Sequence, residues 1–413
     1  MTSQTQSETM TFQRLLTHKE QLHESRIEDG QMEAELSEGE AIIRLERFGL
    51  TTNNITYAAF GDAMEYWKFF PTGQDDWGHM PVWGIGRVIA STTDGVRVGD
   101  RYFGYYPMAT HLKLVIDKVT PRGFVEVSDH RQGLPAAYNY YTNCGGTDTS
   151  APESDYRILL RPLFLTSYML SDYLMDNGFF GARQIVISSA SSKTAFGSAF
   201  CIQGNTDARI IGLTSDRNRA FVERLDCYPS VATYDELSSI DADSPTLYID
   251  FSGDSHLREH IHQHFGSNLV HDCYAGSSSN LEFNYESIDD TNHKTRFFFA
   301  APHYRKRVRE LGGRAVLTAM DARQAEFIQA LSNPDAPWVS LCFSDGLEEA
   351  AQVIGRLCHN RVGPDEGHSW SCPDRWGLRS GSGTCHTLSP ASRRAPGLPP
   401  GPAGDSVGPP IPW

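Results

Sequence analysis

The chain of 413 residues lacks any apolar run of about 18 residues, which is the length that a membrane-spanning helix requires. Its first ten residues are polar and contain no apolar segment of a secretory signal. It also lacks an excess of basic residues: its formal net charge is −15, whereas phosphate-binding surfaces carry clustered Lys and Arg. We therefore expect no membrane and no nucleic acid as partners, and a cytoplasmic location.

Paired cysteines are missing as well. The chain has eight cysteines, but none of those up to residue 357 form closely spaced pairs. This pattern fits a reducing compartment better than a disulfide framework. The sequence also contains no G-x-x-x-x-G-K-[ST] loop, so a nucleoside triphosphatase of the P-loop class is not indicated.

What the chain does contain is a strand–turn–helix–strand unit over residues 184–218. The apolar residues 185–187 are typical of a buried parallel strand, and residues 209–213 form a second short apolar run. Between them lies a turn of small residues that opens a helix. In such units the turn amides and the positive end of the helix bind a pyrophosphate.

The glycines of the usual turn are replaced here by Ser, Ala, Lys and Thr over residues 188–194. We take Ser189, Ser191, Ser192, Lys193 and Thr194 as candidates for contact with a dinucleotide. For Lys193 two interpretations stay open: direct contact with the pyrophosphate, or simple exposure at the start of a helix.

The end of the second strand reads Thr214, Ser215, Asp216, Arg217, Asn218. An NAD-binding unit places an acidic residue here for the ribose hydroxyls. A hydroxyl donor at Ser215 and a guanidinium at Arg217 suit the 2′-phosphate of NADP instead. Asp216 would repel that phosphate if it pointed inward. We favour NADP over NAD, with Thr214 and Asn218 as further contacts.

The rest of the chain suggests an α/β protein with two main domains. Residues 1–37 form a polar leader whose apolar residues have helical spacing. Short strands with regular turns over residues 38–150 indicate a small barrel, in which Gly84 and Gly86 suggest a close backbone approach. The pattern turns helical near Leu134. Alternating strands and helices over residues 151–315 predict a doubly wound parallel sheet, and residues 316–357 predict return helices.

The tail over residues 358–413 is rich in Pro and Gly. Such a segment buries too little apolar surface to offset the entropy of ordering, so we expect it to be disordered and to contribute no strand. Its Cys and His residues match no zinc-finger spacing, and we predict no structural metal there.

Two segments of the predicted barrel carry a family resemblance. Residues 83–91 (Trp-Gly-Ile-Gly-Arg-Val-Ile-Ala-Ser) and 94–104 (Asp-Gly-Val-Arg-Val-Gly-Asp-Arg-Tyr-Phe-Gly) resemble the core strand and following turn of the medium-chain dehydrogenase/reductase superfamily. Residues 248–253 resemble its next cofactor-facing strand, which adds Ser252 to the cofactor candidates. The serine-rich turn resembles a bacterial branch related to the zinc-independent quinone oxidoreductases. The resemblance implies a GroES-like barrel domain and a Rossmann domain.

The sequence departs from the zinc-dependent members of that superfamily. Their early loop holds a Cys, but residues 51–57 contain none, and their Gly-His-Glu is replaced by Pro81, Val82 and Trp83. We therefore predict no zinc. By the same resemblance, Asn54, Tyr57 and Tyr66 are the candidate proton donors. For each Tyr a second interpretation stays open and is favoured, that of an amphipathic core or rim residue with a bonded hydroxyl.

The resemblance implies a zinc-independent, NADP-dependent oxidoreductase that transfers hydride to a small enone, quinone or acyl substrate. A homodimer is a further expectation. The alternative, motivated by the missing glycines, is a degenerate dehydrogenase fold that acts as a non-catalytic binding or scaffold protein.

Overall fold

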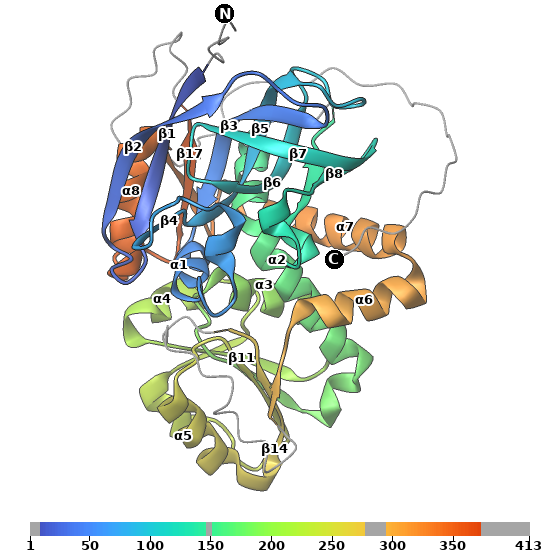
Figure 1. The fold of residues 1–413 in the computed structure, drawn as a ribbon. Coiled ribbons are helices and arrows are strands. Elements are labelled where there is room, and N and C mark those ends of the chain that lie inside the picture. Colours follow the sequence, from blue (N-terminus) through green and yellow to red (C-terminus); the bar gives the residue numbers. More distant parts are fainter. Residues whose placement is uncertain (1–8, 146–150, 277–294, 373–413) are drawn as a thin grey trace, which may run out of the picture.

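The computed structural model describes residues 9–145, 151–276 and 295–372, and it arranges them as a barrel domain above a parallel-sheet domain (Figure 1). The long helix α2 (Pro152–Asp176) connects the two in the chain and packs against elements of both domains. The predicted combination of a GroES-like barrel and a Rossmann-type sheet is confirmed.

The barrel closes because its last strand pairs with its first. The strand order is β3-β5-β6-β9-β8-β7, and β7 pairs back with β3. A close backbone approach is confirmed at Gly84, where a Cβ would lie 2.4 Å from the Arg47 carbonyl oxygen. At Gly86 a Cβ would instead lie 2.3 Å from the Ile43 side chain. The strands are β3 (Glu40–Leu50), β5 (Pro81–Ser91), β6 (Arg101–Pro107), β7 (His111–Thr120), β8 (Gly123–Glu126) and β9 (Tyr140–Asn143).

The prediction of a helical leader is wrong for the described part of residues 1–37. Strands β1 (Thr9–His18) and β2 (Ser25–Glu33) form a hairpin, and β4 (Trp77–Gly78) pairs with β1. The ring of Phe12 lies over Gly30, where a Cβ would approach it to 2.5 Å. The cause is tertiary: Leu15 and Leu16 are fully buried, and the Leu15 amide bonds the Met108 carbonyl at 2.8 Å.

Two further local predictions need correction. The early loop at residues 51–57 is mostly helix α1 (Thr52–Ala59), because the side chains of Thr51 and Asn54 form a capping box at its start. The change to helix near Leu134 is also wrong. That region contains only the 3₁₀ turns η2 (Asp129–Arg131) and η3 (Ala136–Tyr138) before β9, and the long helix starts at Pro152.

The predicted doubly wound sheet is confirmed. Six parallel strands run in the order β12-β11-β10-β13-β14-β15. Ile185 and Ile187 of β10 join the core under α2, α3 and α7, whereas Val186 points to the opposite face with Leu257 and Ile261 of α5. The strands are β10 (Gln184–Ile187), β11 (Arg209–Thr214), β12 (Ser230–Thr233), β13 (Thr246–Asp250), β14 (Leu269–Tyr274) and β15 (Thr295–Phe297). The helices are α3 (Lys193–Ile202), α4 (Arg219–Glu223), α5 (Ser255–Phe265), α6 (Ala300–Leu311) and α7 (Gly313–Leu331).

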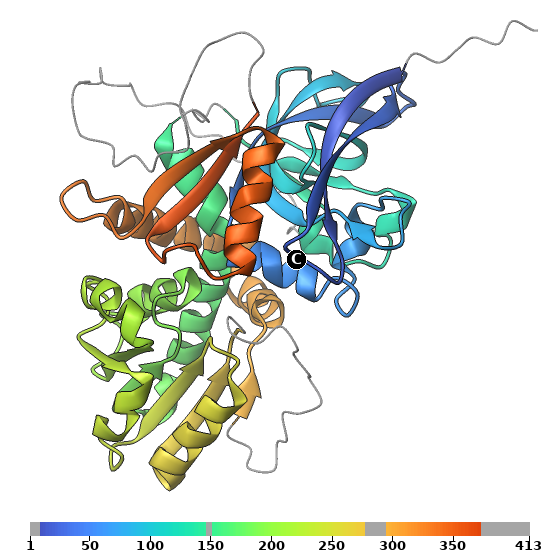
Figure 2. The same cartoon turned by 90° about the vertical axis from the view of Figure 1, so that its left-hand side faces the viewer.

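The chain then returns to the barrel domain. Helix α7 still packs in the core of the parallel-sheet domain, whereas α8 (Gly346–Cys358) packs in the barrel core. Figure 2 shows α8 beside the two strands that flank it, β16 (Ser340–Asp345) and β17 (Glu366–Ser371). Of the helices predicted for residues 316–357, only α8 therefore reaches the barrel.

The prediction that the tail contributes no strand is wrong at its start. Strand β17 pairs in parallel with β16 and antiparallel with β3, so it lies inside the sheet. Its Trp370 is 1% exposed and stacks on Phe48 at a ring distance of 4.4 Å. The remainder of the predicted tail, beyond Cys372, lies outside the described residues. Within the described ranges, no helix is both long and apolar enough to cross a membrane.

Trp370→Ala should destabilise the protein by about 3–5 kcal/mol, because it empties a buried aromatic site and leaves the Gly346 carbonyl without the indole N–H that now lies 2.7 Å away. Val98→Ala is the control, because Val98 is 67% exposed and its loss should be nearly neutral. Urea denaturation followed by circular dichroism measures both changes. Equal stability of the two variants would contradict the placement of β17.

Candidate nucleotide-binding site

The carboxyl ends of β10, β11, β12 and β13 meet at one edge of the parallel sheet. Ile187 pairs with Gly212, and Thr214 pairs with Thr233, so Ser189, Thr214 and Thr233 lie at about the same level at this edge. In open parallel sheets of this strand order, ligands bind outside these ends. Most of the candidate cofactor residues therefore gather where a dinucleotide would be expected.

The turn after β10 is built from serines that bond to its own backbone and neighbours. Ser189 has a φ of 47°, a left-handed conformation that normally favours glycine. The hydroxyl of Ser191 accepts the Asn218 side-chain amide at 3.0 Å. Ser192 is the N-cap of α3, and its hydroxyl accepts the Ala195 amide at 3.3 Å. The serines thus hold the turn in shape without the usual glycines.

Lys193 points away from the turn. Its ammonium donates to the carbonyl oxygens of Pro364 at 3.1 Å and Glu366 at 2.8 Å, next to and in strand β17. Loss of hydration lowers the pKa of Lys193 to about 8, and the neighbouring Asp365 and Glu366 partly offset this. In this structure the charge of Lys193 joins the two domains, and neither of the two interpretations from the sequence describes it.

Thr194 and Thr214 differ in their hydrogen bonds. The Thr194 carbonyl accepts the hydroxyls of Ser167 and Ser198, both at 2.8 Å, which anchors the first turn of α3. Thr214 ends β11 and is 1% exposed, and its hydroxyl has no hydrogen-bond partner among the described residues.

The segment after Thr214 reaches the surface. Ser215 precedes the 3₁₀ turn η5 (Asp216–Asn218). Arg217 is exposed and forms no ion pair or hydrogen bond with any described residue. Its guanidinium is therefore available to an anion at the end of the second strand. Asp216 is also exposed, so its carboxylate is not buried within the site.

Asp250 organises the edge, and sequence reasoning missed it. It is fully buried at the end of β13, and one carboxylate oxygen accepts the hydroxyls of Ser188 at 2.9 Å and Ser252 at 2.7 Å. The same oxygen accepts the Ser252 and Gly253 amides, and the other accepts Arg258 at 2.8 Å. Ser252 is thus a structural link between the turn and the loop after β13. A carboxylate inside an otherwise apolar strand was the available signal.

Tyr234 is the second residue that the sequence reading missed. It follows β12 as the first residue of the 3₁₀ helix η6 (Tyr234–Ser239), and its hydroxyl accepts the Ser189 amide at 3.2 Å. Because β11 lies between β12 and β10, the phenol crosses the end of β11 to reach the turn. Burial raises the pKa of Tyr234, although the contact with Ser189 opposes this.

Of the three candidate proton donors, Asn54 and Tyr57 lie on α1, and Tyr66 begins the 3₁₀ turn η1 (Tyr66–Phe69), which contacts α1. Helix α1 lies on the side of the barrel domain that faces the parallel-sheet domain (Figures 1 and 2). Asn54 is 3% exposed, and its side chain is used structurally. Its amide nitrogen donates to the Pro81 carbonyl at 2.9 Å, and its oxygen accepts the Thr51 amide at 2.8 Å. The structure therefore separates Asn54 from the two tyrosines in role.

Tyr57 and Tyr66 lie together in an aromatic cluster, with ring centroids 4.8 Å apart. The Tyr57 hydroxyl accepts the indole N–H of Trp83 at 3.1 Å, and the Tyr66 hydroxyl lies 3.1 Å from that of Tyr138. Burial raises the pKa of Tyr57. Both hydroxyls are thus hydrogen-bonded within the cluster. Tyr138, which sequence reasoning missed, is like Trp83 only partly buried.

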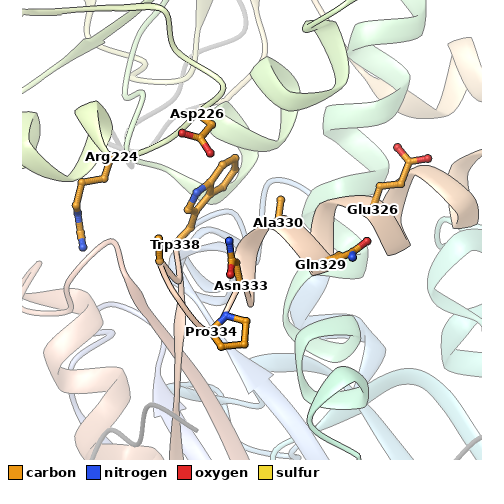
Figure 3. A pocket seen from close by; sticks show the side chains of 9 residues that line it. Arg224, Asp226, Glu326, Gln329, Ala330, Asn333, Pro334 and Trp338 are labelled. Atoms are coloured by element: carbon orange, nitrogen blue, oxygen red, sulfur yellow. The ribbon is translucent and has the colours of Figure 1, made fainter. Parts of the chain in front are cut away.

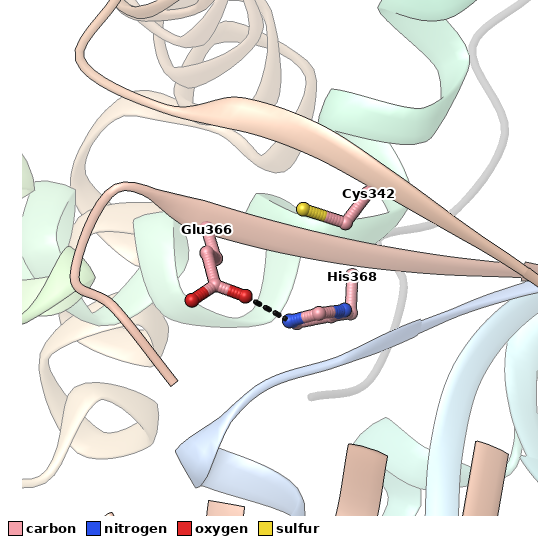
Figure 4. A group of neighbouring side chains, drawn as sticks. All are labelled: Cys342, Glu366 and His368. Atoms are coloured by element: carbon pink, nitrogen blue, oxygen red, sulfur yellow. Dashed lines mark hydrogen bonds and ion pairs between the residues drawn. The ribbon is translucent and has the colours of Figure 1, made fainter. Parts of the chain in front are cut away.

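Three potential metal ligands, Cys342, Glu366 and His368, lie within 4.8 Å of one another on β16 and β17 (Figure 4). The Glu366 carboxylate already accepts Arg356 at 2.7 Å, the Gly363 amide at 2.7 Å and His368 at 3.0 Å. Glu366 and His368 thus belong to a polar network at the end of the sheet, and we assign no metal to the group.

A cavity of about 530 Å³ lies between α7 and the region that follows α4 (Figure 3). Its lining includes Arg224, Asp226, Glu326, Asn333 and Trp338. It carries both signs of charge and includes none of the site residues predicted from the sequence.

Comparison with known proteins places the chain in a family. The model described as "Protein of unknown function (DUF2855)" matches residues 48–363. The chain belongs to the DUF2855 family. No curated protein sequence matches it.

Solved structures share the fold of this DUF2855 protein at low sequence identity. CurA from Vibrio vulnificus in complex with NADPH is 11% identical, with a TM-score of 0.56 over 88% of this chain and 99% of that chain. A putative NADPH:quinone reductase from Bacillus thuringiensis is 13% identical, with a TM-score of 0.52 over 88% and 99%. These likenesses show the fold that the resemblance to the medium-chain dehydrogenase/reductase superfamily implied.

Lys193→Met should change how stability depends on pH. The folded pKa of about 8 lies below the unfolded value of about 10.4, so between these values the unfolded chain binds the extra proton. The free energy of unfolding of the wild type should therefore rise with pH over this window relative to Lys193→Met, and the difference should be constant below pH 8.

Parallel urea titrations of the wild type and the variant across this range measure the effect, and other titrating groups cancel in the difference. A constant difference at all pH values would mean that the Lys193 ammonium is hydrated as in the unfolded chain.

Proposed function

We propose that this protein is a zinc-independent, NADP-dependent oxidoreductase that transfers hydride to a small enone, quinone or acyl substrate. The observation that carries the proposal is the carboxyl edge of the parallel sheet. There a positive helix end, a serine-rich turn and an exposed arginine lie in the order that a phosphorylated dinucleotide requires. The NADPH named for CurA and for the Bacillus thuringiensis protein adds support.

The proposed contacts divide by the part of the ligand they meet. Ser189, Ser191 and Ser192 would surround the pyrophosphate, together with the amino end of α3. Thr214, Ser215, Arg217 and Asn218 would surround the adenosine ribose and its 2′-phosphate. When bound, the nicotinamide supplies the hydride, and the protein contributes orientation and a proton.

The clustered tyrosines are the best candidates for the proton donor. Tyr66 and Tyr57 hold hydrogen-bonded hydroxyls on the side of the barrel domain that faces the parallel sheet. Asn54 is a weaker candidate than the sequence suggested, since both ends of its amide are already bonded to the backbone. Zinc has no part in the proposal, because residues 51–57 and 81–83 lack the Cys and His ligands that would hold it.

The alternative function is a non-catalytic binding or scaffold protein. Two observations favour it: Tyr234 occupies a turn amide, and Lys193 bonds the other domain instead of facing the turn. A ligand that binds only the folded state raises its stability. An unchanged thermal unfolding midpoint with NADPH and with NADH at millimolar concentration would therefore support this alternative. A cytoplasmic location and a homodimer stay predictions.

Arg217→Ala should weaken NADPH by about 1.5–3 kcal/mol and leave NADH nearly unchanged, because only the 2′-phosphate offers the guanidinium a charged partner. Arg209→Ala is the matched control: Arg209 lies at the amino end of β11, the strand that precedes Arg217, and its loss should leave both affinities unchanged. Isothermal titration calorimetry measures the dissociation constants. Equal weakening of NADPH and NADH by Arg217→Ala would exclude Arg217 as the reader of the 2′-phosphate.

Tyr66→Phe should lower kcat for NADPH-dependent reduction of 2-cyclohexen-1-one on the order of 100-fold, because it removes a proton donor and keeps the ring. The dissociation constant of NADPH should not change. Tyr140→Phe, on the partly exposed β9, is the control. Steady-state assays provide the comparison, and unchanged turnover in both Tyr57→Phe and Tyr66→Phe would mean that the cluster is only structural.

A further inference from the structure

Tyr234 belongs to no part of the proposed contacts, yet it reaches into the centre of the site. The amide of Ser189 lies in the turn whose N–H groups would bind a pyrophosphate, and the Tyr234 hydroxyl already accepts that N–H at 3.2 Å. One N–H cannot point at two acceptors with good geometry at once. A phosphate oxygen and Tyr234 therefore compete for the same donor.

The position of the phenol also indicates competition with a dinucleotide. Tyr234 comes one residue after Thr233, which pairs with Thr214, and its hydroxyl meets the turn beyond β11. The side chain therefore spans the stretch from the second strand to the turn, where the ribose and the pyrophosphate of a dinucleotide adjoin. Thr214 lies at the end of this strand with a buried hydroxyl that has no partner among the described residues.

The backbone that carries Tyr234 is anchored, but its ring is not enclosed. The side chains of Thr233 and Glu236 form a capping box at the start of η6, and both oxygens of Glu236 accept Arg219, at 2.7 and 2.8 Å. The ring is only partly buried against the apolar core under α5. Rotation of the side chain alone, without a change in η6, would release the Ser189 amide.

We propose that Tyr234 gates the nucleotide site: its hydroxyl closes the turn in the empty protein, and a dinucleotide binds only after the phenol rotates away. This inference rests on the proposed dinucleotide function and describes how binding at that site is regulated. The gate sets the fraction of molecules competent to bind, so the apparent dissociation constant is the intrinsic one divided by that fraction.

Tyr234→Phe tests the gate, because it keeps the ring and removes the competing hydrogen bond. NADPH and ADP should both bind roughly two- to tenfold more tightly to the variant in the full chain, the range expected for one net hydrogen bond. In stopped-flow fluorescence the association rate should rise by that factor, with the dissociation rate unchanged. Tyr173→Phe is the control, because its hydroxyl lies 3.4 Å from His271, in the first half of β14 and away from the carboxyl edge.

The outcomes separate the gate from the proposed function. Equal or weaker binding by Tyr234→Phe, above all through faster dissociation, would make Tyr234 a ligand contact or a bystander and overturn the gate while the nucleotide function stands. If neither the wild type nor Tyr234→Phe binds NADPH, NADH or ADP, both proposals fail. Binding by Tyr234→Phe alone would support both. Thermal unfolding of each variant confirms that it is folded.

Discussion

Strand β17 holds the two domains in their relative position. Its backbone completes the sheet between β16 and β3, and its Ser369 hydroxyl donates to Asp155 of α2 at 2.7 Å. Asp155 also accepts Arg47 of β3 at 2.6 Å, so these partners stabilise a carboxylate whose pKa burial raises. The carbonyl of Glu366 then accepts the ammonium of Lys193. The helix that would bind the pyrophosphate is thereby tied to the barrel domain by a charge.

The serine-rich turn contains a left-handed residue at a place where glycine is usual. A left-handed residue costs free energy unless it is glycine, or unless surrounding contacts hold it. Here Ser189 takes that conformation, and its amide is bonded to Tyr234. Ser188 on one side is fixed by the buried Asp250, and Ser192 on the other caps α3. The turn is thus shaped by side-chain hydrogen bonds from three neighbouring segments, and this dependence is why its ligand could not be deduced from the fold alone.

Several features could be predicted from local sequence, because burial on both faces leaves a clear apolar run. The strands at residues 184–187 and 209–214 follow this rule. The late helix at 346–358 was recognisable instead by the helical spacing of its apolar residues, which form one buried face. The strand at 366–371 could not be found in this way. Its residues Glu, Gly, His, Ser, Trp and Ser have little apolar character, and β16 and β3 supply the pairing that stabilises them. The leader shows the same limit, since Leu15 and Leu16 fit a helix or a strand equally until the barrel buries them.

By itself, the sequence determined the two-domain class, the unusual turn and the arginine after the second strand, because each depends on residues close together in the chain. Tertiary structure alone decided which side chains remain available to a ligand. The Lys193 ammonium is bonded to carbonyls more than 170 residues later in the chain instead of facing the turn. The Asn54 side chain is already bonded in a helix cap and to the Pro81 carbonyl. The Tyr234 hydroxyl reaches the turn from the segment that follows β12. Hydrogen bonds between distant segments determine which of these side chains can contact a ligand, and such bonds leave no periodic signal in a sequence.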